Sequence, residues 1–284
     1  MIQCTKKGMY QSMKRFIFTL FALLITVGAV YAENIKFVQI TDAHLSADSE
    51  FTLKVLNSAV ADINNQQNIA FVVFTGDNIN TPNEKNLVTF TNIANKLKVP
   101  YYVVLGNHDV YKNHNMSKTQ YYEIIRKESP LRRHQRTGNY KFKTNGFVFL
   151  TVDGAKEIIP GAVGYYRQDT LNWVDKTLSK NRRRSVVIFQ HFPIEYPQGA
   201  ERRLKTHKTY KVEEYQNMLS KHNNVLAVLS GHLHVNGETM KDGVYHISTP
   251  SLLSTPNSYK IIDIVTTKGF SPIIYTQLKE FDVE

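Results

Sequence analysis

The stretch IKFVQITDAH, residues 35–44, joins an apolar run typical of a β-strand to an aspartate and a histidine. The pattern returns in IAFVVFTGDN, residues 69–78, and in YYVVLGNHD, residues 101–109. Short runs of β-branched and aromatic residues that stop at glycine or asparagine predict buried strands. Polar side chains placed directly after such strands are expected at one edge of the sheet, where open α/β sheets bind their ligands.

Segments with a helical period separate these strands. Residues 84–97 and 168–178 predict two helices, and a third is expected after residue 50. Strands that alternate with helices indicate an α/β fold built in layers. The apolar face of the helix expected after residue 50 comprises Phe51, Val55, Ala59, Val60 and Ile63.

The second half of the chain is richer in strands. Residues 110–139 and 192–210 lack a clear period, contain many cations and are predicted to be long loops, which are often functional. Further strands are predicted at residues 147–152, 185–189, 225–229, 244–247, 261–265 and 273–277.

Two of these later strands also end in imidazole groups. Residues 185–189 are followed by Gln-His, and residues 225–229 by Ser and then Gly-His-Leu-His. The glycines at positions 76, 106 and 231 permit tight turns between the strands and the polar side chains that follow them. Seven candidate metal ligands result: Asp42, His44, Asp77, Asn107, His191, His232 and His234.

The chemistry of this set favours transition metals. Mixed imidazole and oxygen ligands suit Zn, Fe or Mn better than Ca or Mg. Seven ligands are too many for one tetrahedral site. They suit two ions that share a carboxylate and lie about 3.5–4 Å apart, as in phosphatases and nucleases.

The order of the motifs carries a family resemblance. Asp-x-His, Gly-Asp, Gly-Asn-His-Asp, a lone His and Gly-His-x-His follow one another between Asp42 and His234, and this series resembles the calcineurin-like metallophosphoesterase family. The resemblance implies a four-layer αββα sandwich with two central mixed β-sheets. It also implies an enzyme that hydrolyses phosphomonoesters or phosphodiesters, with a metal-bound hydroxide as the nucleophile and a small anionic phosphate ester as the substrate.

The resemblance further implies a role for each ligand. Asp77 is expected to bridge the two ions. His108 is implied to be an imidazole that binds no metal but contacts the phosphoryl oxygens and protonates the leaving group. Asp109 is expected to orient the ligands without binding a metal itself. One ion would take Asp42, His44, Asp77 and His234, and the other Asp77, Asn107, His191 and His232.

The sequence departs from two well-known branches. Asn78-Ile79-Asn80 replaces the residues that follow Gly-Asp in the protein phosphatases of the family. No tyrosine occurs between Asp77 and Tyr101, where purple acid phosphatases place an iron-bound tyrosine. A metal-stabilised binding protein without turnover remains as an alternative. His108 favours the enzyme, because a binding protein has no chemical need of it.

Residues 1–32 have the layout of a secretory signal peptide. Lys14 and Arg15 precede an apolar run that ends in Val30-Tyr31-Ala32, with small residues placed for cleavage. An uncleaved membrane anchor is the alternative. If the signal is cleaved, no membrane span is expected, and residues 33–284 form one domain. The only cysteine, Cys4, would also leave, and the cysteine-free, Lys- and Asn-rich remainder fits a bacterial periplasmic or secreted protein.

The formal net charge of +11 in 284 residues is concentrated partly in the two long loops. Such runs are often solvated, but they could also hold the anionic part of a substrate. Extended nucleic acid is not expected as a partner, because no recognition helix carries the cations. Candidate substrate contacts are Arg132, Arg133, Arg136, Arg202 and Arg203, candidate stacking groups are Tyr121, Tyr122, Tyr140, Tyr196 and Tyr210, and solvation is expected for His114, His134 and His207.

Overall fold

The computed structural model describes residues 34–129, 137–267 and 269–283. The expected signal peptide lies outside these residues. Arg132, Arg133, His134 and Arg136 of the first basic loop also lie outside them. Within the described part of the chain, no helix combines the length and the apolar character needed to cross a membrane.

One sheet contains the strands of the opening motifs. Its order is β11-β10-β1-β2-β3, in which β1, β2 and β3 are parallel and β10 and β11 are antiparallel additions. The strands are β1 (Ile35–Ile40), β2 (Ile69–Phe74), β3 (Tyr101–Val103), β10 (Ser258–Val265) and β11 (Ile273–Glu280).

The other sheet contains the later strands in the order β4-β5-β6-β7-β9-β8. Strands β5, β6, β7 and β9 are parallel, and the two edge strands β4 and β8 are antiparallel to their neighbours. The strands are β4 (Tyr140–Thr144), β5 (Phe147–Val152), β6 (Val186–Gln190), β7 (Val225–Ser230), β8 (Gly237–Lys241) and β9 (Val244–Ser248).

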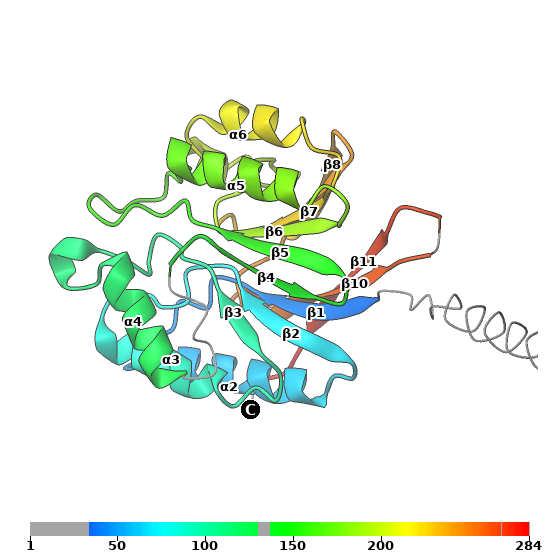
Figure 1. Cartoon of the computed structure of the whole chain (residues 1–284). Coiled ribbons are helices and arrows are strands. Elements are labelled where there is room, and N and C mark those ends of the chain that lie inside the picture. The colour runs from blue at the N-terminus through cyan, green and yellow to red at the C-terminus, as the bar shows by residue number, and fades with distance from the viewer. Residues whose placement is uncertain (1–33, 130–136, 268, 284) are drawn as a thin grey trace, which may run out of the picture.

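The two sheets pack face to face through aromatic side chains. Phe37 stacks on Phe71 with ring centroids 4.7 Å apart, and Phe149 meets both rings from the other sheet. Helices cover the outer faces, so the chain forms the predicted αββα sandwich (Figure 1). The outer helices are α2 (Glu50–Asn65), α3 (Glu84–Ala94) and α4 (Lys118–Glu128) on the β1 sheet, and α5 (Gln168–Lys180) and α6 (Val212–Leu219) on the β5 sheet.

The structure corrects the prediction that residues 110–139 form a long loop. Helix α4 lies in this segment and starts at a capping box, in which Ser117 and Gln120 exchange side-chain to backbone hydrogen bonds. Tyr121 and Tyr122 of α4 are buried, and Tyr140 on β4 is buried as well. These three rings are therefore core residues and cannot stack on a nucleobase.

Other elements were missed or misjudged in detail. Phe51 of α2 is 55% exposed, so its assignment to the apolar face was wrong, whereas Val55, Ala59, Val60 and Ile63 are buried. Helix α6 and the edge strands β4 and β8 were not predicted. They are short, and each buries only part of its residues.

Candidate metal centre

The candidate ligands follow the carboxyl ends of five strands. Asp42 and His44 lie after β1, Asp77 after β2 and Asn107 after β3. The remaining three histidines lie after β6 and β7 of the other sheet. The fold therefore brings both halves of the sandwich to one edge, as the sequence pattern requires.

Five of these residues adopt left-handed backbone conformations. Such values are uncommon outside glycine and cost about 1–3 kcal/mol each, so they persist where the surrounding structure holds them. The strained turns aim successive side chains toward one point. The five residues are Asp42, His44, Asp77, His232 and His234, with φ between 40° and 69°.

Glycines make room for these turns. Gly76 has a φ of +98°. A Cβ atom on Gly106 would overlap with the carboxylate and backbone nitrogen of Asp77, and one on Gly231 would overlap with the Thr41 hydroxyl. The glycines are thus required by close approach of the chain to the candidate ligands.

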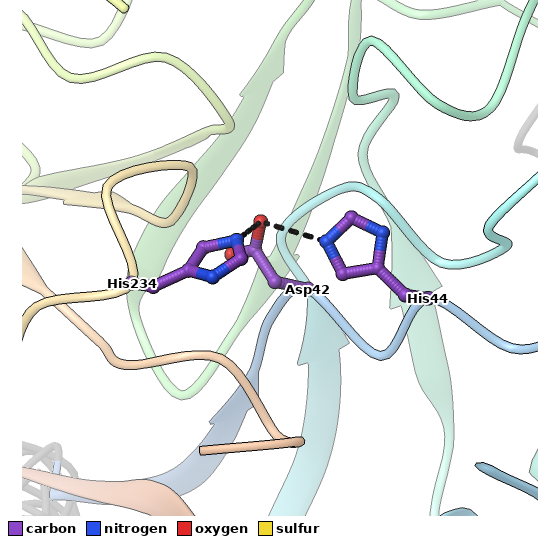
Figure 2. Close-up of side chains that lie close together, drawn as sticks. All are labelled: Asp42, His44 and His234. Atoms are coloured by element: carbon purple, nitrogen blue, oxygen red, sulfur yellow. Dashed lines mark hydrogen bonds and ion pairs between the residues drawn. The ribbon is translucent and has the colours of Figure 1, made fainter. Parts of the chain in front are cut away.

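Asp42 anchors the first group of ligand atoms. Its Oδ1 lies 3.1 Å from His234 Nε2 and 3.8 Å from His44 Nε2 (Figure 2). Its Oδ2 accepts hydrogen bonds from the Thr41 hydroxyl at 2.7 Å and from the His232 backbone at 2.9 Å. Oδ2 is therefore held by two hydrogen bonds, and Oδ1 faces two imidazoles.

Asp77 joins the first group to a second one. Its Oδ2 lies 3.4 Å from His191 Nε2 and 3.8 Å from His44 Nε2, so it stands between imidazoles of the two implied ligand sets. Its Oδ1 accepts a hydrogen bond of 2.8 Å from the backbone of His108. The carboxylate is buried and held in the orientation that a bridging role needs.

Backbone carbonyls fix the tautomers of two histidines. His191 Nδ1 donates to the Thr75 carbonyl at 2.8 Å, and His232 Nε2 donates to the Ala162 carbonyl at 2.7 Å. Carbonyl partners of this kind orient metal-binding imidazoles. The other nitrogens, His191 Nε2 and His232 Nδ1, then face each other at 3.2 Å beside Asp77. Two lone pairs and a carboxylate oxygen this close require a cation between them, either a proton or a metal ion.

Asn107 follows β3 and is the ligand that the family resemblance adds to the second group. Its Oδ1 is buried, and no donor among the described residues reaches it. A buried amide oxygen without a donor is costly unless another group binds it. An ion held by Asp77, His191 and His232 would supply that partner, so the residues present fit a metal centre.

The charges of the site agree with this fit. Burial raises the pKa of Asp77, but the His191 imidazole outweighs it and the pKa falls to about 2. Burial lowers the pKa of His191, but Asp77 and Asp42 raise it to about 9. Burial lowers the pKa of His232 to about 3. Without metal ions, a proton on His191 would offset one of the two carboxylate charges, and metal ions would replace that proton.

His108 lies at the open side of the site and is half-buried. Its Nδ1 donates to the Asn80 carbonyl at 2.8 Å, which orients the ring. The ring meets that of His44 edge to face, with centroids 4.7 Å apart. A nitrogen of His108 lies within 4.8 Å of ligand atoms of His44 and Asp77, so the ring is close enough to contact a group bound there.

Asp109 supports two of the turns, as the sequence suggested. One oxygen accepts hydrogen bonds from the backbones of Asn78 and Ile79, and the other accepts from the backbone of Gly106. Burial, and after it the Asp77 carboxylate, raise the pKa of Asp109 to about 7. Asp109 ties the turn after β2 to the turn after β3 and is a positioning residue.

The second basic loop contributes residues whose position the sequence did not reveal. Arg203 Nη2 donates to His234 Nδ1 at 3.1 Å, whereas Arg202 is exposed. The ring of His207 packs on that of His232 at 5.0 Å and is half-buried, so the expectation of a solvated side chain was wrong. His114 is exposed, as expected.

Comparison with known proteins agrees with the fold and with the family resemblance. The family profile described as calcineurin-like phosphoesterase matches residues 35–236. A probable glycerophosphodiester phosphodiesterase of Arcobacter nitrofigilis is 24% identical over 229 residues, which cover 75% of this chain and 77% of that protein. A probable cyclic nucleotide phosphodiesterase of Moraxella catarrhalis is 25% identical over 203 residues, with 70% and 71% covered.

Solved structures show the same fold. A dimetal phosphatase from Danio rerio aligns with a TM-score of 0.64 and 17% identity, covering 84% of this chain and 98% of that one. A Plasmodium protein described as the anchor in the inner membrane complex aligns with a TM-score of 0.54 and 13% identity, covering 88% and 89%. At these identities the likeness concerns the fold alone.

Proposed function

The chain belongs to the calcineurin-like phosphoesterase family and is a metal-dependent phosphoric ester hydrolase, and we propose that it cleaves small water-soluble phosphodiesters outside the cytoplasm. The observation that carries the proposal is the meeting of two ligand groups at Asp77, with His108 at their side. The names of the similar proteins favour diesters, because both sequence relatives are described as phosphodiesterases.

The site divides into two ion-binding halves. One would consist of Asp42, His44, Asp77 and His234, and the other of Asp77, Asn107, His191 and His232. Two bound ions, which we expect to be Fe, Mn or Zn, would supply an activated water and neutralise charge on the phosphoryl oxygens.

The protein contributes orientation and a proton. Asp77 keeps Oδ2 free for the ions, because its Oδ1 is engaged by the His108 backbone. His108 donates from Nδ1 to the Asn80 carbonyl, so a second proton on Nε2 can pass to the oxygen of the departing alcohol. A binding protein without turnover has no use for this arrangement.

Export is the remaining part of the proposal. It rests on the sequence of residues 1–32, with a basic start, an apolar middle and a small residue at position 32. It implies that the substrate is present in the periplasm or the medium.

We expect phosphodiesters to be the preferred class in a substrate panel. The panel contains a glycerophosphodiester, a 3′,5′-cyclic nucleotide, a nucleoside monophosphate and an aryl phosphate, and kcat/KM is measured with the metal content of the same sample. The two diesters should exceed the two monoesters by about tenfold or more, a difference of about 1.4 kcal/mol in the transition state. Turnover of monoesters alone contradicts the diester assignment, and no turnover of any ester by the two-metal protein supports the binding protein.

Arg203→Gln should weaken the binding of highly charged substrates. An imidazole that binds an ion through Nε2 keeps its proton on Nδ1, so His234 could no longer accept from Arg203, and the guanidinium would be available to an anion. KM for a substrate with a second negative charge should rise about tenfold, with kcat nearly unchanged. A singly charged diester should be affected less.

The matched control is Arg202→Gln, which removes the same charge from an exposed neighbouring side chain. Its KM should stay within about twofold of the unmodified protein, because exposed charges are screened over about 8 Å at physiological ionic strength. Equal effects of the two variants on KM would mean that both arginines act only through their charge, without a specific contact between Arg203 and the substrate.

A further inference from the structure

The chain enters the described fold at the end of the sandwich opposite the metal centre. Asn34 precedes β1, and its carbonyl accepts a hydrogen bond from the Asn145 side chain at 2.9 Å. Its own side-chain oxygen accepts from the backbone of Thr266 at 3.0 Å. The entry point is therefore fixed against the turn between β4 and β5 and the end of β10.

Five exposed cations lie around this entry point. They occupy strand β4 near its end, the last residue of α5 and the segment between α5 and β6. None of them forms an ion pair with a described residue. Elsewhere among the described residues there are 15 ion pairs, some of which join a histidine to a carboxylate. We name Lys143, Lys180, Arg182, Arg183 and Arg184 the basic face.

Two surface hollows connect the basic face to the entry point. One, of about 440 Å³, is lined by all five cations together with Ser179 and Asn181. The other, of about 460 Å³, is lined by Arg183 and Arg184 and also by Thr266, which binds Asn34. The cations and the entry of the chain thus share one surface.

The strand directions separate this surface from the metal centre. The basic face precedes β6, and Asn34 precedes β1, whereas the candidate ligands follow the same strands. Six residues of strand at about 3.3 Å each give a separation of about 20 Å. A partner on the basic face would leave the metal centre open to water.

The segment before Asn34 contains the apolar, uncharged run from Phe16 to Ala32. Such a run enters a membrane during export, and the rest of the chain emerges beside that membrane whether or not cleavage follows. We propose that the basic face docks on an anionic phospholipid surface and holds the metal centre away from it, toward soluble substrates. This inference rests on the export that is part of the proposed function, but its test depends on neither export nor turnover.

The expected strength follows from the number of cations. A lysine or arginine near an anionic bilayer strengthens binding by roughly fivefold, and the effect decays within a Debye length of about 8 Å. Neutralising three arginines should therefore weaken binding by roughly 100-fold. Added salt should also weaken the binding of the unmodified protein, because it screens the same charges.

The first experiment measures sedimentation with vesicles. Both hydrophobic clusters of the described residues lie between Ile35 and Phe281, so a chain without residues 1–33 keeps both clusters. This chain is mixed with vesicles of neutral lipid or of neutral lipid with 30% phosphatidylglycerol by design. The triple variant Arg182→Gln, Arg183→Gln, Arg184→Gln is compared with Lys54→Gln, Lys85→Gln, Lys127→Gln, which removes three exposed charges from the helices of the other sheet.

The docking proposal expects binding to anionic vesicles only, lost in the arginine variant and kept in the lysine variant. Equal losses in both variants, or no binding at low salt, overturn it. Tighter binding to a DNA duplex than to the vesicles assigns the face to nucleic acid instead.

A second experiment uses the full chain in the same vesicles and measures modification of arginines by phenylglyoxal, mapped by mass. Anionic lipid should protect Arg182, Arg183 and Arg184 at least threefold, and Arg167 at the site end should not change. Equal modification with and without anionic lipid contradicts docking for the full chain as well.

Discussion

Asp77→Asn should abolish both metal binding and turnover. The carboxylate Oδ2 is the atom that faces imidazoles of both ligand groups, 3.4 Å from His191 and 3.8 Å from His44. An amide supplies no negative charge and offers at most one weakly binding oxygen, so neither half keeps its ion. We expect a loss in kcat/KM of more than about 1,000-fold, since both water activation and charge neutralisation depend on the ions.

Elemental analysis of the purified variant is the direct measurement. Asp263→Asn is the control, because Asp263 lies on β10 at the surface and, among the described residues, forms an ion pair with Lys36 alone, at 3.5 Å. It should keep both ions and full activity. Two firmly bound ions in the Asp77 variant would refute the bridging role, whatever happens to turnover.

His108→Ala should keep both metal ions and lose about 10²–10⁴-fold in kcat, the usual contribution of a positioned acid or base. The Asn80 carbonyl holds Nδ1 of this ring, and a His108 nitrogen lies within 4.8 Å of ligand atoms of His44 and Asp77. Each of the two implied sets nevertheless has four ligands without His108. Its removal should therefore affect chemistry more than metal content.

The leaving group separates proton donation from simple phosphoryl binding. The 4-nitrophenolate group of a 4-nitrophenyl diester leaves without being protonated. Hydrolysis of that diester should therefore be reduced far less in the variant than hydrolysis of a glycerol diester. His114→Ala, which removes an exposed imidazole stacked on Tyr111, should change neither rate. A uniform loss on both diesters would assign His108 to binding the phosphoryl oxygens alone.

The fold was predictable where local pattern and burial coincide. Strands β1, β2 and β5 coincide with the apolar runs of the sequence at residues 35–40, 69–74 and 147–152, because most residues of these runs are buried. Helix α4 was missed because its sequence is polar and its only clear signal is the Ser117 capping box. Phe51 was misplaced because helical periodicity locates an apolar stripe but not its outer limit.

The order of the motifs, together with the family resemblance, determined the chemistry proposed for the site. Five strand ends with Asp, Asn and His side chains define a two-metal set, because parallel strands in one layered fold present their carboxyl ends at one edge. The structure brings these residues together, while their binding of metal awaits the measurements above. The family resemblance also pointed to Asp109, although its hydrogen bonds across two turns were not foreseeable.

By itself, the sequence determined the layered class, the candidate ligands and the apolar leader. The tertiary structure alone decided which residues contact the candidate ligands. Arg203 donates to His234, the ring of His207 packs on His232, and the Ala162 carbonyl accepts from His232. It also decided that the basic face surrounds Asn34. Local sequence encodes period and burial over a few residues. These contacts join residues 25 or more positions apart, whose approach depends on the packing of both sheets.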